Sequence, residues 1–319
     1  MVFRKSFKRA LALGFTVFIL YMIYGKTDLH SLKNNFININ KTNLFWAFCL
    51  FPVLPLIKAF RWKIILGKEL NPTYFAALKV LMTGSVFNLF APSKLGDFSR
   101  VYFSRKILTV DPKRIFNSVI VEKISDVFTL CLVCLISLNF VDVNYRIKIF
   151  ILIFSFMLFF CLFAVVNINF HKFKFSEYLF QKLRLMEIFD DARGLKKELK
   201  YNKIYFIKIL FISIFYWYIV LFQIYLFFLT FNTHVSLLLV FGLVPVALFI
   251  GMIPVTISGI GTRDVALIFL FSRYYSPEIM ASIGILCSSR SLVNSLIGLP
   301  FFLMHCFSEN KIQEQRVEN

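Results

Sequence analysis

Charged residues are scarce in this chain, and acidic residues are the scarcest. Only 17% of the 319 residues are charged, and 17 Asp and Glu residues stand against 36 Lys and Arg residues. Hydrophobic residues make up 59% of the chain, with 42 Phe, and the mean hydropathy is +0.74. Soluble domains carry more charge and fewer apolar residues. The composition therefore excludes a soluble protein and predicts an integral membrane protein.

Long polar segments are also missing. The longest one runs from about residue 171 to residue 203, which is too short for a second folded domain. We therefore expect a single integral membrane domain over residues 1–319. Residues 171–203 are predicted to form a cytoplasmic loop that lies as a basic helix against anionic headgroups. The alternative is a plain connector whose charge only sets the topology.

Sequence patterns for metal binding and redox chemistry are absent. The 4 His residues are scattered along the chain, without the spacing that a metal site needs. Cys131 and Cys134 are separated by two residues in an apolar segment, where thiols pack as small apolar side chains. We therefore expect no metal and no cofactor, and we assign no catalytic residue.

Apolar stretches of spanning length predict six membrane-crossing helices. Two further apolar stretches, at about residues 74–100 and 236–272, are broken at their centres and predict re-entrant hairpins. The expected fold is an all-α polytopic membrane protein with about six spanning helices plus two re-entrant broken hairpins in an inverted repeat. The six predicted spans cover about residues 10–24, 44–60, 115–138, 148–168, 204–231 and 279–305.

The distribution of Lys and Arg predicts that both termini are cytoplasmic. With re-entrant hairpins, 25 of these residues fall on the inside and 6 on the outside, as the positive-inside rule requires. The order span, span, hairpin, span then occurs twice, at about residues 10–138 and 148–305, and the second copy starts on the opposite face. Such an inverted repeat brings the two hairpin tips together near the midplane of the bilayer.

Both interruptions combine Pro and Gly with an acid and a base. They read NLFAPSKLGDFSR over residues 88–100 and MIPVTISGIGTRD over residues 252–264. Backbone groups freed at membrane depth must be satisfied by protein or by a water-filled cavity. Paired breaks in the two halves of a membrane protein are typical of a transporter's central site. The predicted tip residues are Pro92, Gly96, Pro254, Gly259 and Gly261.

Charged side chains at membrane depth mark the expected binding site. Glu122 and Asp126 share one helix face, and Arg290 lies near the middle of the last predicted span. Guanidinium groups bind phosphate bidentately, so the predicted ligand is an anionic headgroup. A structural alternative is an ion pair of Arg290 or Arg263 with one of these carboxylates. The predicted substrate-binding residues are Lys94, Asp97, Arg100, Glu122, Asp126, Arg263, Asp264 and Arg290.

Three charged motifs follow one another along the chain. They are Pro92-x-x-x-Gly96-Asp97 with Arg100, then Glu122-Lys123-x-x-Asp126, then Pro254 leading into Gly259-x-Gly261-x-Arg263-Asp264. The set resembles the flippase-like membrane domain of lysylphosphatidylglycerol synthases and its stand-alone relatives, over nearly the whole chain. That family usually has Arg-Glu in the last motif and Glu-Arg in the middle one. Both differences keep the charge.

The resemblance implies a membrane domain that moves lipid between leaflets. It does not extend to the soluble aminoacyl-transferase domain of the full-length synthases, so we expect no lysylphosphatidylglycerol synthesis by this chain. The leading hypothesis is a lipid translocase of the cell (inner) membrane, acting on an anionic phospholipid or a polyprenyl-phosphate-linked saccharide. The expected partners are membrane lipids and not nucleic acid.

Two alternatives come from other functional classes. The first is an integral membrane enzyme of lipid or cell-envelope glycan biosynthesis, with Asp97, Glu122 or Asp126 as its base. The second is an accessory subunit that positions a glycosyltransferase or lipid-synthase partner. A covalently changed lipid would indicate the enzyme, and loss of activity on removal of another gene product would indicate the subunit.

Overall fold

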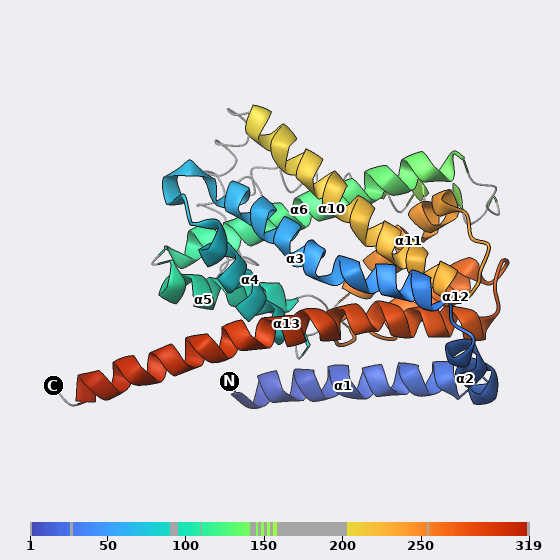
Figure 1. The fold of residues 1–319 in the computed structure, drawn as a ribbon, viewed down its shortest axis with the longest axis horizontal. Coiled ribbons are helices and arrows are strands. Elements are labelled where there is room, and N and C mark those ends of the chain that lie inside the picture. The colour runs from blue at the N-terminus through green and yellow to red at the C-terminus, as the bar shows by residue number, and fades with distance from the viewer. Residues whose placement is uncertain are drawn as a thin grey trace, which may run out of the picture.

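The computed structural model describes residues 2–25, 28–89, 95–108, 110–140, 203–253 and 255–317, with a few isolated positions between 145 and 157. Across these residues all regular elements are helices (Figure 1), which confirms the all-α class. The first part contains α1 (Val2–Tyr24), α2 (Leu29–Ile37), α3 (Lys41–Leu70), α4 (Tyr74–Phe87), the 3-10 helix η1 (Leu95–Ser99), α5 (Arg100–Ile107) and α6 (Pro112–Leu138). The second contains α10 (Lys203–Thr230), α11 (Leu237–Met252), α12 (Thr262–Phe271) and α13 (Pro277–Val317).

Three of the described helices are long and apolar enough to cross a membrane. Their apolar segments are Lys41–Gly67, Ile204–Thr230 and Pro277–Cys306, at the positions of the predicted spans 44–60, 204–231 and 279–305. Helix α6 has 27 residues, or about 40 Å, but it also carries five charged side chains. The predicted span at 10–24 falls within α1. Most of the predicted span at 148–168 and most of the loop at 171–203 lie outside the described residues.

Helix α3 corrects one boundary. The sequence predicted that this span ends at about residue 60, but the helix continues to Leu70, with non-helical backbone at Gly67, where φ is 78°. Arg61 and Trp62 are consequently inside the helix and fully buried. A hydropathy pattern ends a span at the first charges, because it does not distinguish a buried arginine from an exposed one.

Each interrupted segment forms two helices around a break. Helix α4 has 14 residues and α12 has 10, which makes them about 21 and 15 Å long. Both are shorter than the hydrocarbon core of about 30 Å. Figure 1 shows α4 and α5 toward the end of the bundle from which the C-terminal part of α13 projects, and α11 and α12 toward the other end, near α2. The two broken segments therefore approach the middle of the bundle from opposite ends.

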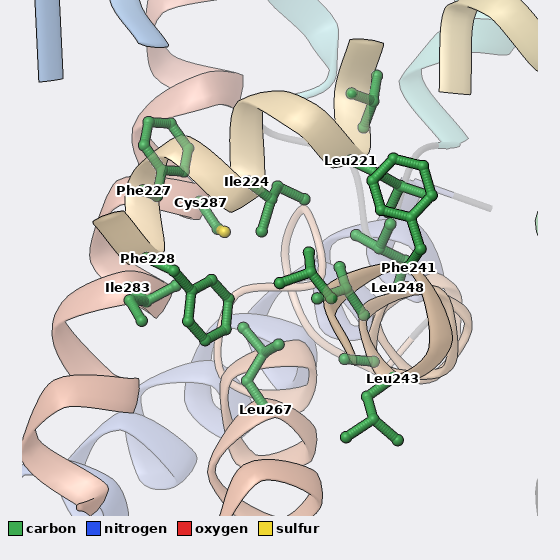
Figure 2. Packing of buried hydrophobic residues seen from close by; sticks show 14 of the residues in the cluster. Leu221, Ile224, Phe227, Phe228, Phe241, Leu243, Leu248, Leu267, Ile283 and Cys287 are labelled. Carbon is green, nitrogen blue, oxygen red and sulfur yellow. The ribbon is translucent and has the colours of Figure 1, made fainter. Parts of the chain in front are cut away.

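The second broken segment lies in the main apolar core. Every residue of α11 from Leu239 to Phe249 is buried, as expected for a helix that is apolar on all sides. Figure 2 shows Phe228 of α10, Leu267 of α12 and Ile283 of α13 pointing toward one another in this core. The second hairpin is thus held by apolar packing against its neighbours.

The first broken segment is held to α13 by small residues. A Cβ atom on Gly298 would collide with the carbonyl oxygen of Met82 in α4. The Ser295 hydroxyl donates a 2.9 Å hydrogen bond to the Ser85 carbonyl, and the Ser85 hydroxyl lies 3.1 Å from the Asn294 carbonyl. Small residues and interhelical hydrogen bonds of this kind drive helix association in membranes.

Candidate functional site

A glycine lies against the end of the first helix in both hairpins. A Cβ atom on Gly96 would be 2.6 Å from the backbone nitrogen of Asn88, at the end of α4. A Cβ atom on Gly259 would be 2.5 Å from the carbonyl oxygen of Gly251, in the last turn of α11. Gly259 also has φ at +73°, which favours glycine. Both breaks therefore need a residue without a side chain at these positions.

An arginine follows each of these glycines after three intervening residues. Arg100 starts α5, and Arg263 lies in the first turn of α12. Each arginine packs on a glycine of the preceding helix, because Cβ atoms on Gly84 and Gly251 would be 3.0 Å from Arg100 Cγ and 2.9 Å from Arg263 Cβ. The two halves thus place a guanidinium group at equivalent points of the two breaks.

The first arginine belongs to a buried ion-pair network. Arg100 Nη1 donates to Glu122 Oε2 at 2.6 Å, and its Nη2 lies 3.0 Å from Asp97 Oδ1. The guanidinium also lies over the Trp62 ring, 5.6 Å from the ring centroid. Charges at this depth are tolerated only when they are paired and hydrogen-bonded. Arg100 is therefore held by its own hairpin and by α6 together.

Arg61 of α3 completes the same network from the other side. It donates to Asp126 Oδ1 at 2.5 Å and to Glu122 Oε1 at 3.0 Å. Asp126 also accepts a 2.8 Å hydrogen bond from the indole of Trp217 in α10. Arg61 has no exposed side-chain surface. Both carboxylates of α6 are therefore engaged by arginines other than Arg263 and Arg290, which the sequence had offered as their partners.

Asp97 is surrounded by further cations. Lys58 Nζ lies 3.5 Å from Asp97 Oδ2, and Lys123 also donates to that oxygen. The amide of Asn88 donates to Asp97 Oδ1 at 3.0 Å. A carboxylate with this many donors is stabilised in its charged form. It links the tip of the first hairpin to α3, α4 and α6.

The second arginine is paired with its neighbour in the chain. Arg263 donates to Asp264 Oδ1 through Nε at 3.0 Å and Nη2 at 2.7 Å. The other oxygen of Asp264 accepts from the Gly261 backbone nitrogen at 3.0 Å and so caps α12. Arg263 Nη2 also donates to the Gly284 carbonyl and to the Ser288 hydroxyl of α13. Asp264 thus serves the helix cap and the orientation of Arg263 together.

A cavity of about 140 Å³ lies where the two hairpins meet. Its wall comes from α3, α4, η1, α5, α10, α11, α12 and α13 and includes the tip glycine Gly259. Among the described residues of the wall, the side chains that carry charge are Lys58, Asp97, Arg100, Arg263 and Arg290. With the ion-pair partners behind the wall included, six described cations stand against four carboxylates. This excess of positive charge suits an anionic group.

Arg290 is the cation of this cavity with the fewest polar partners among the described residues. Its Nε is buried and has no hydrogen-bond partner within the part of the chain that the structure describes. No ion pair is formed by Arg290 among those residues. A buried guanidinium group without an acceptor is costly, so a ligand oxygen at this point would be favoured.

The predicted site residues separate into two layers. Asp97, Arg100, Arg263 and Arg290 line the cavity. Glu122 stands behind Arg100 and Asp264 behind Arg263, whereas Asp126 contacts Arg61, which is not part of the cavity wall. The positions of Lys94, Pro92 and Pro254 lie outside the described residues. For Glu122 and Asp126, direct contact with substrate stays a prediction. Their described contacts orient Arg61 and Arg100.

Sequence reasoning missed four residues of this region. They are Lys58 and Tyr216 in the cavity wall, Arg61 in the network, and Asn294 on α13. The signal for Arg61 was its position beside Trp62, 11 residues before Pro72. A helix can continue from an apolar stretch until a proline stops it. Within the described residues no group of three or more His, Cys, Asp or Glu could hold a metal ion.

Comparison with known proteins gives a family for this arrangement. The family described as lysylphosphatidylglycerol synthase TM region matches residues 9–298. The chain is also similar to the UPF0104 membrane protein MJ1595 of Methanocaldococcus jannaschii, with 23% identity over 300 residues, which cover 87% of this chain and 88% of the relative. The match to the family spans most of the chain and includes both hairpins. This membrane protein therefore belongs to the family of the lysylphosphatidylglycerol synthase transmembrane region.

Proposed function

We propose that the chain is a lipid translocase, which moves an anionic phospholipid or a polyprenyl-phosphate-linked saccharide between the leaflets of the cell membrane. The observation that carries the proposal is the cavity between the two broken hairpins. Its described wall holds four cations and one carboxylate, and Arg290 Nε has no acceptor among the residues that the structure describes. Arg263 and Arg290 would bind the phosphate, and the acyl or prenyl tails would stay in the bilayer.

The arrangement of the hairpins supports passage through the bundle. In this proposal both hairpins are re-entrant, the first open to the cytoplasm and the second to the outside, with both termini cytoplasmic. The short helices α4 and α12, and the location of the two hairpins toward opposite ends of the bundle, support it. A headgroup at their meeting point would then be reached from either side when one hairpin shifts.

The state of the carboxylates favours transport over catalysis. Asp97, Glu122 and Asp126 each contact at least one cation at 3.0 Å or closer. A carboxylate in such a pair is engaged by donors of the protein and is not directed at a substrate. The side chains that the enzyme hypothesis needs are thus used for holding arginines.

Reconstitution tests the proposal. Purified protein in liposomes should exchange labelled anionic phospholipid or polyprenyl-phosphate lipid between leaflets faster than it exchanges a zwitterionic lipid. Arg290→Gln should lower the anionic rate about 10- to 100-fold, because it removes a charge-assisted contact to phosphate. Arg273→Gln is the matched control, because Arg273 is exposed and outside the cavity. Equal rates in Arg290→Gln and wild type would contradict the proposal.

A further inference from the structure

Asn294 lies one helical turn after Arg290 on α13, and both residues line the cavity. Residues four apart share a helix face. Asn294 Oδ1 is buried and, like Arg290 Nε, has no hydrogen-bond partner across the described parts of the chain. An unpaired acceptor therefore stands beside an unpaired donor on one face of α13.

These two groups need opposite partners. The guanidinium nitrogen needs an acceptor, which a phosphate oxygen supplies. The amide oxygen needs a donor, which a hydroxyl or an ammonium group supplies. Each buried group without a partner favours a ligand that provides one.

Neighbouring hydroxyl groups in the wall add further acceptors. Ser85 donates its proton to the Met82 carbonyl at 2.7 Å, and Ser291 donates to the Ser288 carbonyl at 2.8 Å. Their oxygen atoms keep lone pairs for an additional donor. The uncharged part of the wall thus accepts hydrogen bonds from a ligand that carries several donors.

The charge of the wall distinguishes a hydroxyl from an ammonium group. Four cations already face the cavity, and Asp97, the one carboxylate among its described residues, is engaged by Arg100, Lys58 and Lys123. A ligand ammonium group would be repelled by these cations. A neutral hydroxyl group would not.

We infer that Asn294 binds a hydroxyl group of the headgroup whose phosphate Arg290 binds, so that the substrate class is a hydroxylated phosphate ester without an amino group. Phosphoglycerol and a monosaccharide phosphate share this chemistry. The cavity of about 140 Å³ has room for about ten water-sized atoms, which is the scale of such a group. This inference rests on the proposed function and makes Asn294 its specificity-determining residue.

Competition binding to the purified full-length chain in neutral detergent tests it. Phosphatidylglycerol and phosphatidylethanol carry the same phosphodiester charge, but the latter has no headgroup hydroxyl. Wild type should bind phosphatidylglycerol about tenfold more tightly, as expected for one or two buried hydrogen bonds. Asn294→Ala should bring the affinity ratio close to one by weakening the binding of phosphatidylglycerol alone. Asn294→Ser, which keeps an acceptor, should retain part of the ratio, and the exposed-site control Asn139→Ala should retain all of it.

A second pair of ligands distinguishes the two sources of this chemistry. If the natural headgroup is a sugar, polyprenyl phosphate with a monosaccharide should bind more tightly than polyprenyl phosphate without one. This affinity ratio should then exceed the ratio between phosphatidylglycerol and phosphatidylethanol, and it should depend on Asn294. Lysylphosphatidylglycerol should bind wild type about tenfold more weakly than phosphatidylglycerol, and Asn294→Asp should narrow that gap.

The outcomes separate this inference from the proposed function. Tight binding of all anionic lipids with no preference for hydroxylated headgroups, in either pair, would overturn the inference and leave anionic lipid transport intact. A preference that Asn294→Ala does not alter would also overturn it. Absence of binding to any anionic lipid would overturn both.

Discussion

The two hairpins share an outline but hold their arginines by different means. Arg100 is bound by Asp97 of its own hairpin and by Glu122 of α6, which Arg61 of α3 also contacts. Arg263 is bound by the adjacent Asp264 and by two oxygens of α13. The first hairpin is thus tied to two other helices by charge, whereas the second depends on its own helix cap and on apolar packing. Equivalent positions in the two halves therefore have different structural roles.

The largest expected effect breaks the network of the first hairpin. Arg61→Met should destabilise the protein by about 3–5 kcal/mol, because it leaves Glu122 and Asp126 buried with fewer cations. Arg263→Met, which removes the arginine of the second hairpin, should cost less, since Asp264 keeps its bond to the Gly261 nitrogen. Thermal unfolding in detergent, followed by size-exclusion chromatography, measures both.

A double substitution sharpens this result. Arg61→Met combined with Asp126→Leu should recover part of the loss, because the unpaired carboxylate is removed with its partner. Equal losses for Arg61→Met and Arg263→Met would show that the two hairpins are held alike, and the comparison would then be wrong.

The next effect tests what the two hairpins have in common. Gly259→Ala should destabilise by about 1–3 kcal/mol, because φ of +73° strains a residue with a side chain and its Cβ would meet the Gly251 carbonyl. Gly96→Ala should show a loss of similar size through its collision with Asn88. Gly14→Ala in α1 is the control, since its Cβ would meet nothing within 4 Å. If Gly259→Ala leaves the stability unchanged, the second hairpin does not need a residue without a side chain at this position.

The smallest effect on stability comes from cysteines that report topology. Thr73 and Asp111 flank the first hairpin, His234 and Arg273 flank the second, and all four are exposed. Single cysteines at these sites in a cysteine-free background should cost about 1 kcal/mol where a helix cap is lost. Impermeant thiol reagents should label the first pair from the cytoplasmic side and the second pair from the outside.

Labelling of Thr73→Cys and Asp111→Cys from opposite sides would show that the first hairpin crosses the membrane. The inverted repeat would then fail, and the cavity would need another route of access.

The sequence predicted the hairpin breaks well because their causes are local. Proline, glycine and φ-dependent strain act within a few residues, so Gly96 and Gly259 could be named as tip residues before their contacts were known. The positions of Arg100 and Arg263 in the same cavity followed from the repeat of the pattern. The same order of apolar and broken segments in both halves predicts equivalent positions for the two arginines.

Pairing partners could not be predicted in the same way. Glu122 and Asp126 were correctly placed on one helix face, but which arginine faces them depends on the rotation of α3 about its axis. Each residue turns a helix by about 100°, so the inward position of Arg61 depends on the continuation of α3 beyond the predicted end at residue 60. A hydropathy profile gives no information about that rotation.

The charge of the cavity is the central claim, and a cysteine within it measures that charge most directly. Ser291 lines the cavity and is partly exposed, so Ser291→Cys in a cysteine-free background is open to small thiol reagents. An anionic methanethiosulfonate reagent should modify it at least tenfold faster than a cationic reagent of similar size, as opposite charge raises the local reagent concentration. Phosphatidylglycerol should slow that reaction, and Ser272→Cys, at the exposed end of α12, should show neither effect. Faster modification by the cationic reagent, or no protection by anionic lipid, would contradict an anionic headgroup site between the hairpins.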